Sequence, residues 1–355
     1  MASGSVQRRA VQAVALVVFC GALSFAQRAP AAAPAQSSAS SQGVIIYHAG
    51  SLNAEFDSLG EAFTKLTGIR VTHRGMGSVE AARRVTVGRE PCDIYASADF
   101  MTIDAFMKPV YADYTILFAQ SRVVLAYTPA SRNAASIADP KSPAFAPPGS
   151  VPNAAANWYT YLTQPGVRIG GSDPSADPGG YRALMVLQLA QPFYGIGTLY
   201  QDLFRNHVIT SQTDRLGVDY DYQFVYEHSA RASAGKDPQY RYLRLPVEMD
   251  LSSPARAAYY SQAAVTIAGL ASTDPSYVMR GSRAIFGLTV LKNAPNREAA
   301  IRFLQFMLSP KPGEGVELQA ASGPEPIGPN GPAWASVDDY VKLPVPLAQL
   351  VKLRP

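Results

Sequence analysis

Cysteine, histidine and charge are scarce in this chain, and each shortage excludes a class of protein. The two cysteines, Cys20 and Cys92, cannot build a disulfide framework or a four-cysteine metal site. The four histidines show no metal-ligand spacing such as HExxH. A net charge of +4 over 355 residues is too small for a nucleic-acid footprint, so we expect no nucleic-acid partner. Hydrophobic residues make up 47 %, enough for a globular chain of about two lobes.

The motifs of common hydrolases and nucleotide-binding enzymes are missing too. The chain contains neither a GxSxG nucleophile elbow nor a GxxxxGK[ST] phosphate loop. A secreted α/β hydrolase therefore stays only as an alternative from a different functional class. The pair Tyr259-Tyr260 is of a type that binds ferric iron, but no Asp or His partners cluster beside it in the sequence. We expect a protein that is not an enzyme and that holds neither a cofactor nor a free metal ion.

The first 26 residues have the pattern of a secretory signal peptide. The Arg8-Arg9 pair precedes an apolar stretch over 10–25, and small residues at Ser24 and Ala26 suit a cleavage site. The apolar stretch is shorter than the ~20 residues of a membrane span, which disfavours a transmembrane anchor. The arginine pair leaves general and twin-arginine export open. We therefore expect an exported, periplasmic protein.

Residues 27–42, rich in Ala, Pro, Ser and Gln, are predicted to be a disordered tether, because they cannot bury enough apolar surface to order themselves. The folded part is expected to begin near Gly43. A lipid anchor at Cys20 is the weaker variant, because Phe19 stands where a small residue is needed.

The mature chain alternates between buried strands and helices. Strands are expected over 44–47, 69–72 and 92–97, each followed by a small-residue turn and a helix, which indicates parallel α/β pairing. Further strands are expected over 122–127, 167–171, 221–226, 265–270 and 284–291, with helices from 181 and over 295–308. Strands that leave and re-enter the first lobe predict its extent as 43–125 plus 291–350, and residues 126–290 form the other lobe.

Three strand-to-helix turns carry the residues of a candidate anion site. Ser51, Ser78 and the run Asp177-Pro178-Gly179-Gly180 each open a helix, where unpaired backbone N–H groups favour an anion. Serine hydroxyls beside those amides would make an oxyanion pocket without Lys or Arg. Ser and Asp are also the ordinary N-cap residues, so a purely structural role stays open for each turn.

Several segments together resemble the periplasmic molybdate/tungstate-binding proteins of ABC transporters. The resembling segments are YHAGSLNAEF, RGMGSVEAARRV, CDIYASADF, FAQSRVVLAYTPAS, SDPSADPGGYRALMVLQLA, LRLPVEMDLSSP and LTVLKNAPNREAAIRFLQFMLS. The likeness covers about residues 44 to 328. It implies a two-lobed type II periplasmic-binding fold, with mostly parallel sheets, flanking helices and a cleft between the lobes. It also implies a monomer that captures molybdate or tungstate and delivers it to a membrane permease.

Carried over residue by residue, the resemblance assigns five positions to the oxyanion. Gly50, Ser51 and Ser78 match the first-lobe contacts, Asp177 matches the carboxylate loop of the second lobe, and Tyr226 matches its tyrosine. Asp177 is also the residue that could ligate the metal of the oxyanion. A receptor for a sulfate-like anion or for ferric iron is the alternative within the binding class.

One departure from the family bears on coordination. Archaeal members carry a glutamate before the tyrosine, whereas HVITSQTDRLGVDYDY contains none and leaves Val208 or Gln212 at the corresponding place. Glu248 is the one nearby acid to test as a substitute. A carboxylate at Asp177 repels a dianion unless it is protonated, binds the metal, or caps its helix and points away.

Overall fold

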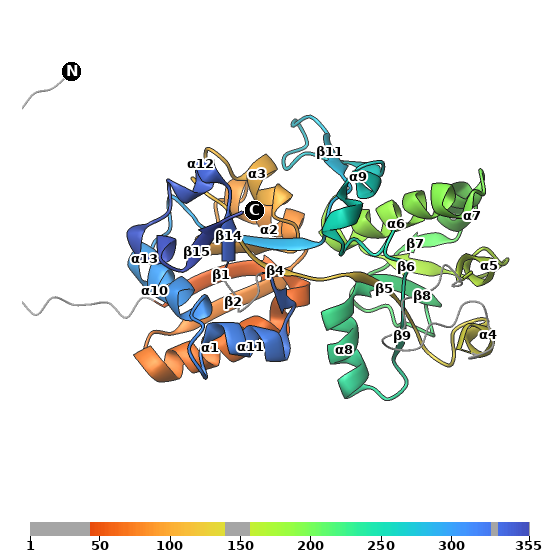
Figure 1. Ribbon diagram of the computed structural model, residues 1–355, viewed down its shortest axis with the longest axis horizontal. Coiled ribbons are helices and arrows are strands. Elements are labelled where there is room, and N and C mark those ends of the chain that lie inside the picture. Colours follow the sequence, from red (N-terminus) through yellow and green to blue (C-terminus); the bar gives the residue numbers. More distant parts are fainter. Residues whose placement is uncertain (1–42, 139–156, 328–332, 355) are drawn as a thin grey trace, which may run out of the picture. The chain divides into compact units, whose positions relative to one another are not determined.

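Two mixed sheets organise the computed structural model, which describes residues 43–138, 157–327 and 333–354 (Figure 1). The described residues belong to one compact unit that begins at Ser41. The predicted signal peptide (1–26) and tether (27–42) lie outside the described residues. So does most of the expected loop over 139–157.

The first sheet, with the helices that pack on it, is called the first lobe. Its strand order is β15-β14-β4-β12-β3-β1-β2, and β13 pairs with β4. The strands are β1 (Val44–Ala49), β2 (Val71–Met76), β3 (Ile94–Ser97), β4 (Ile116–Gln120), β12 (Ile285–Val290), β13 (Glu325–Pro326), β14 (Ala333–Ala335) and β15 (Val351–Leu353). The helices are η1 (Gly50–Leu52), α1 (Asn53–Thr67), α2 (Ser78–Thr86), α3 (Met101–Phe106), α10 (Arg297–Met307), α11 (Gly315–Ser322), α12 (Val337–Tyr340) and α13 (Val345–Ala348).

The second sheet and its helices are called the second lobe. Its strand order is β7-β6-β8-β5-β9. The strands are β5 (Val123–Tyr127), β6 (Ile169–Gly171), β7 (His207–Ile209), β8 (Tyr222–Tyr226) and β9 (Arg241–Arg244), with a separate hairpin of β10 (Ala264–Ile267) and β11 (Tyr277–Arg280). The helices are α4 (Ala134–Ala138), α5 (Tyr159–Leu162), α6 (Pro178–Tyr194), α7 (Leu199–Arg205), α8 (Glu227–Lys236), η2 (Pro254–Arg256) and α9 (Ala257–Tyr260).

The parallel pairing expected from the strand–helix alternation forms one end of each sheet. β1 pairs in parallel with β2 and β3, and β6 pairs in parallel with β7 and β8. Both sheets also contain antiparallel strands. β12 pairs antiparallel with β3 and β4, and β5 pairs antiparallel with β8 and β9. The sheets are therefore mixed. β5 pairs in the second sheet and β12 in the first. The predicted extents of the two lobes, 43–125 plus 291–350 and 126–290, stay a prediction.

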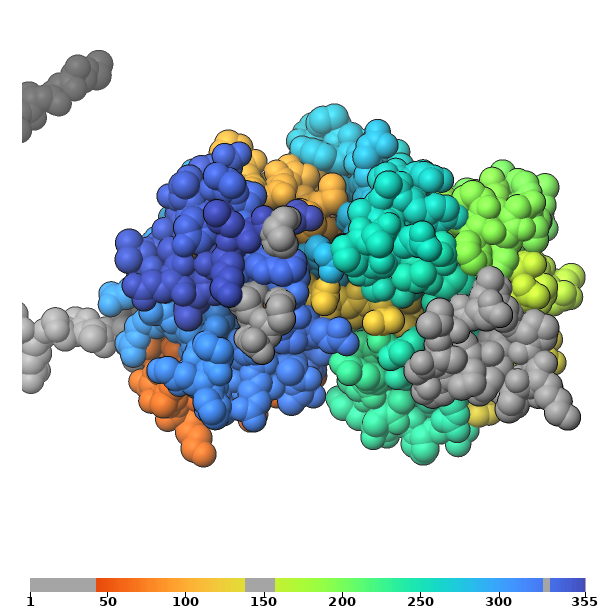
Figure 2. Space-filling view, in the orientation of Figure 1, coloured from red at the N-terminus to blue at the C-terminus, as the bar shows by residue number. Residues whose placement is uncertain are grey.

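Segments distant in sequence share the first lobe. Figure 1 shows the orange N-terminal and blue C-terminal segments side by side there, and Figure 2 shows the C-terminal segment covering one face of it. The helices bury apolar faces predicted from their spacing: Phe56 and Phe63 of α1 and Phe303 of α10 are at most 1 % exposed. Phe303 stacks on Phe56 and meets Phe63 edge-on, which joins α10 to α1.

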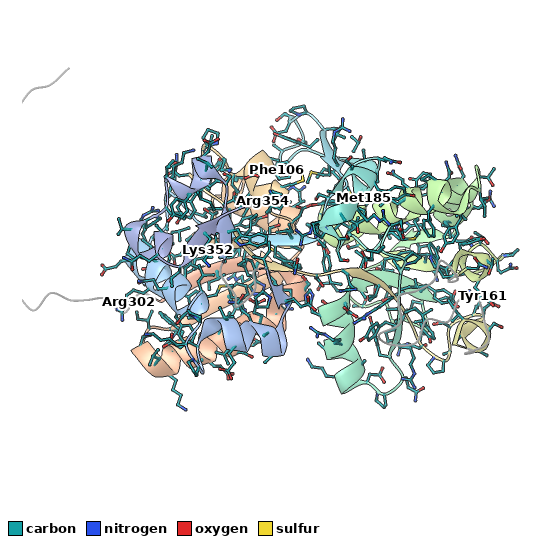
Figure 3. The ribbon with its side chains drawn as sticks, viewed as in Figure 1. Phe106, Tyr161, Met185, Arg302, Lys352 and Arg354 are labelled. Carbon is teal, nitrogen blue, oxygen red and sulfur yellow. The ribbon has the colours of Figure 1, made fainter. Side chains whose placement is uncertain are left out.

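Direct contacts join the two lobes. Arg83 of α2 donates from Nε to the Leu270 carbonyl oxygen at 2.9 Å. Phe106 of α3 packs against Tyr277 of β11 with ring centroids 4.6 Å apart, and Figure 3 labels Phe106 beside this hairpin. No helix among the described residues is long and apolar enough to cross a membrane.

Candidate functional site

Four strand-to-helix junctions frame the candidate site. β1 leads through η1 into α1, β2 leads into α2, β6 leads into α6 and β8 leads into α8. β1 and β2 are parallel neighbours with Ala49 opposite Met76, and β6 and β8 are parallel neighbours with Gly170 opposite Gln223. Because the carboxyl ends of parallel neighbours meet at one sheet edge, each lobe brings two helix N-termini together. Such termini offer unpaired N–H groups to an anion.

A cavity of about 140 Å³ lies against three of these junctions. Its polar lining consists of Ser51, Ser172, Asp177, Arg182, Gln223, Tyr226 and Ser229. On the same measure one water molecule needs about 10–15 Å³, so the cavity has room for a small ion together with water. Of the five residues predicted for the oxyanion site, the fold brings Ser51, Asp177 and Tyr226 to this cavity. Gly50 and Ser78 are not among its lining residues, and the binding role of all five stays a prediction.

Ser51 presents an unused hydroxyl to the cavity. Its Oγ is buried and has no hydrogen-bond partner. A buried hydroxyl left unpaired costs about 1–3 kcal/mol, so a ligand or a water that fills the cavity stabilises this position. The preceding Gly50 is not required by its neighbours, because a Cβ there would lie 3.9 Å from the nearest atom, in Met76.

Ser78 is fully buried, and its hydroxyl has a structural partner. Its Oγ accepts a hydrogen bond from the Ala98 N–H at 3.1 Å, which leaves the hydroxyl proton free to donate. Gly77 does require the absence of a side chain, because a Cβ would lie 2.4 Å from the carbonyl oxygen of Ala176. That carbonyl accepts from the N–H of Glu80 at 3.0 Å, so a second-lobe loop docks directly on the start of α2.

Asp177 caps its helix while it lines the cavity. Its Oδ1 accepts from the Gly179 N–H at 3.2 Å, and its Oδ2 accepts from the Ser172 hydroxyl at 3.0 Å. Burial raises the pKa of Asp177 above its usual value, although these two donors and the nearby Arg182 oppose that change. The expected cap is therefore present, and burial also favours the protonated form that tolerates a dianion.

Tyr226 is turned into a hydrogen-bond donor by Arg182. The Arg182 Nη1 donates to the Tyr226 hydroxyl oxygen at 2.8 Å. Because a guanidinium only donates, the tyrosine oxygen must accept, and its own proton is free for another acceptor. Burial raises the pKa of Tyr226, so the phenol keeps that proton at neutral pH.

Arg182 also links the lobes, and its charge is paired. Its Nη1 donates to the Ala98 carbonyl oxygen at 2.6 Å, and its Nη2 lies 3.3 Å from Oδ2 of Asp99. The Tyr181 hydroxyl donates to the same Asp99 oxygen at 2.7 Å. Sequence reasoning predicts a pocket without Lys or Arg, whereas the structure places this buried arginine in the lining. Ala98 and Asp99, which hold its side chain at the site, lie more than 80 residues away in the sequence, so no local pattern signals this arginine.

The first turn of α8 contributes two residues that the sequence patterns did not single out. His228 donates from Nε2 to the Ser51 carbonyl oxygen at 3.0 Å, since a carbonyl can only accept, and its Nδ1 then accepts from the Ser121 hydroxyl at 3.0 Å. Ser229 lines the cavity. The sequence could have indicated these two residues, because they follow a strand-to-helix junction at Tyr226 of the same kind as the junction that marked Ser51.

The acid proposed as a substitute for the family glutamate lies elsewhere. Glu248 pairs with Arg256 at 2.9 Å and is not among the lining residues. Val208 and Gln212 do not line the cavity either. Within the described ranges, no group of three or more His, Cys, Asp or Glu side chains is placed to hold a metal ion.

Comparison with known proteins identifies the family. Residues 44–314 match the family described as bacterial extracellular solute-binding protein. The chain belongs to this family. The chain is thus a solute-binding protein, and its family is one of binding proteins rather than enzymes.

Two relatives of this solute-binding protein are named for their ligands. The molybdate/tungstate-binding protein WtpA of Pyrococcus abyssi is 33 % identical over 301 residues, covering 76 % of this chain and 80 % of the relative. The WtpA of Thermococcus kodakarensis is 32 % identical, covering 75 % and 77 %. An uncharacterized solute-binding protein of Petrotoga mobilis is 32 % identical, covering 81 % and 84 %. The resemblance read from the motifs is therefore confirmed at the level of homology.

Solved structures confirm the fold class. The periplasmic molybdate-binding protein of Azotobacter vinelandii superposes with a TM-score of 0.53 at 17 % identity, covering 81 % of this chain and 99 % of that one. The sulfate-binding protein SubI of Mycobacterium tuberculosis gives a TM-score of 0.54 at 16 % identity, covering 81 % and 88 %. The family description places such proteins outside the cytoplasm. Export by a signal peptide stays a prediction, and a lipid anchor at Cys20 stays its weaker variant.

Proposed function

We propose that this solute-binding protein captures molybdate or tungstate in the cavity between its lobes and delivers it to the membrane permease of an ABC importer. The proposal is carried by one observation: the cavity presents hydroxyl protons that have no protein acceptor. Ser51 Oγ has no partner, and Tyr226 is forced by Arg182 to direct its proton elsewhere. The naming of two homologues for molybdate and tungstate supports the choice of oxyanion.

The charges around the cavity suit a dianion held by hydrogen bonds. Arg182 supplies a guanidinium that is already paired with Asp99, so it orders donors without adding a free charge. The α6 N-terminus adds its dipole on the same side. Asp177 accepts two hydrogen bonds from its own lobe, and burial raises its pKa, which lowers its repulsion of the anion. No further cofactor is part of the proposal.

Calorimetric titration of the purified mature protein with tungstate, molybdate, sulfate and phosphate tests the ligand. We expect one tungstate or molybdate per monomer, with sulfate and phosphate bound more weakly. Binding of sulfate at least as tight as tungstate would make the protein a sulfate-type receptor. Failure of all four oxyanions to bind would overturn the proposal.

Delivery is tested with the importer reconstituted in vesicles. The loaded protein should stimulate ATP hydrolysis by the importer more than the ligand-free protein does. Equal rates with and without tungstate would argue against a role in delivery. Size-exclusion chromatography with light scattering tests the expected monomer.

A further inference from the structure

We propose that Ser229 binds the captured oxyanion from the second lobe, opposite Ser51 of the first. The inference rests on the proposed function and assigns a residue that neither the sequence motifs nor the resemblance identified. Ser229 is the third residue of α8, directly after the junction at Tyr226. Its Oγ is buried and has no hydrogen-bond partner, and the residue lines the cavity.

The ordinary structural uses of a serine in a first helical turn do not occupy this hydroxyl. No side chain caps the N-terminus of α8, and the N–H of Glu227 donates to the Arg122 carbonyl oxygen at 2.9 Å. The Ser229 hydroxyl makes no bond to the backbone of its own helix, which is the usual alternative for a helical serine. It therefore retains both its proton and its lone pairs for whatever fills the cavity.

The two orphaned serines share one cavity. Across the described residues, Ser51 and Ser229 are the only serines with a buried hydroxyl that lacks a partner. Both line the same 140 Å³ cavity, one from each lobe. Each unpaired buried hydroxyl is unfavourable because it has lost its bonds to water, and a single anion with several oxygens relieves both costs at once.

A hydrogen bond between the lobes fixes the geometry of the pair. His228, the neighbour of Ser229, donates across the lobes to the carbonyl oxygen of Ser51 at 3.0 Å. This bond ties the first turn of α8 to the turn that carries Ser51. Donors already held in position lose little conformational freedom when they bind, which favours affinity.

The acid nearest to Ser229 in the sequence, Glu227, does not oppose an anion there. Glu227 pairs with Arg244 at 2.6 Å and with Arg122 at 3.1 Å, so its charge is balanced by two cations. Asp177 is the acid that lines the cavity, and it accepts from Gly179 and Ser172. Ser51 and Ser229 can therefore offer the anion one hydroxyl from each lobe.

Titration of Ser229→Ala with sodium tungstate tests the proposal. Loss of a hydrogen bond to a charged group lowers affinity about 10- to 100-fold. The ligand-free variant should melt at or slightly above the wild-type temperature, because no protein bond is lost and alanine favours a helix. Ser229→Thr, which keeps the hydroxyl, should retain more affinity than Ser229→Ala. Ser233→Ala, one turn further along α8 and outside the cavity lining, is the matched control and should bind tungstate like the wild type.

The outcomes separate this inference from the function on which it rests. If Ser229→Ala binds tungstate within twofold of the wild type while Ser51→Ala binds weakly, Ser229 is not a ligand residue and the proposed function stands. Equal losses in Ser229→Ala and Ser233→Ala would also overturn the inference, because the effect would come from the helix. If the wild type binds none of the four oxyanions, both proposals fail.

Discussion

Replacing Ser51 and Ser78 one at a time separates ligand binding from structural support. Both serines open helices of the first lobe, and both were predicted to donate to the same anion. The structure gives their hydroxyls different surroundings. Ser51 Oγ has no protein partner, whereas Ser78 Oγ accepts the N–H of Ala98, a residue only 1 % exposed. The two alanine variants should therefore differ in stability, even though both are expected to bind more weakly.

The expected sizes follow from these contacts. Ser51→Ala removes no bond within the protein, so it should not lower the free energy of unfolding by more than about 0.5 kcal/mol. Its tungstate affinity should fall about 10- to 100-fold, from the loss of one hydrogen bond to a charged acceptor. Ser78→Ala leaves the buried Ala98 N–H without an acceptor and should lose about 1–3 kcal/mol of stability. One kcal/mol lowers the melting temperature by about 2–4 °C in domains of 150–250 residues, and by less in longer chains.

Urea unfolding of the ligand-free proteins and calorimetric titration with tungstate measure both quantities. Ser58→Ala is the control, because its hydroxyl bonds within α1 to the Ala54 carbonyl oxygen at 3.0 Å and lies outside the cavity lining. That variant should bind tungstate normally. The reasoning is refuted if Ser51→Ala loses stability but keeps its affinity, since its hydroxyl would then serve the fold. It is also refuted if Ser78→Ala is as stable as the wild type.

Three further predictions concern buried ionisable groups. Burial raises the pKa of Glu55, whose carboxyl oxygens have no partner, so the native state should lose stability as pH rises above about 4.5, where the unfolded chain ionises this group. Glu55→Gln should therefore be more stable than the wild type in urea at pH 8, and an equal or lower stability would contradict this. Burial lowers the pKa of His228 to about 4, so stability should fall as pH drops from about 6.5 toward 4, by about 3 kcal/mol in full. His228→Gln, which keeps an amide donor, should lose less over that range, and identical urea curves would argue against the assignment. Burial raises the pKa of Asp177, so tungstate affinity should decline as rising pH ionises this carboxyl, and Asp177→Asn should flatten that profile. Calorimetry in buffers of different ionisation enthalpy should show proton uptake for the wild type alone, and uptake by both proteins would refute protonation at Asp177.

Local patterns in the sequence determined the elements and part of the site. The apolar run from Val44 became β1, and the helix predicted over 295–308 is α10 (Arg297–Met307), which buries Phe303. Strand-to-helix turns marked Ser51 and Asp177, because the residues that open a helix are chosen within a few positions of the chain. The motifs also indicated the family, which homology confirms.

The state of each polar group was decided by the tertiary structure alone. Ser51 and Ser78 occupy similar turns, yet only Ser78 meets a buried N–H, from a residue 20 positions later. Arg182 enters the lining because the other lobe supplies Asp99, and it then sets the direction of the Tyr226 proton. Whether a hydroxyl is already bonded or free for a ligand depends on which distant strands and helices pack beside it. Sequence spacing records the type of a residue and its place on an element, and it carries no information about those partners.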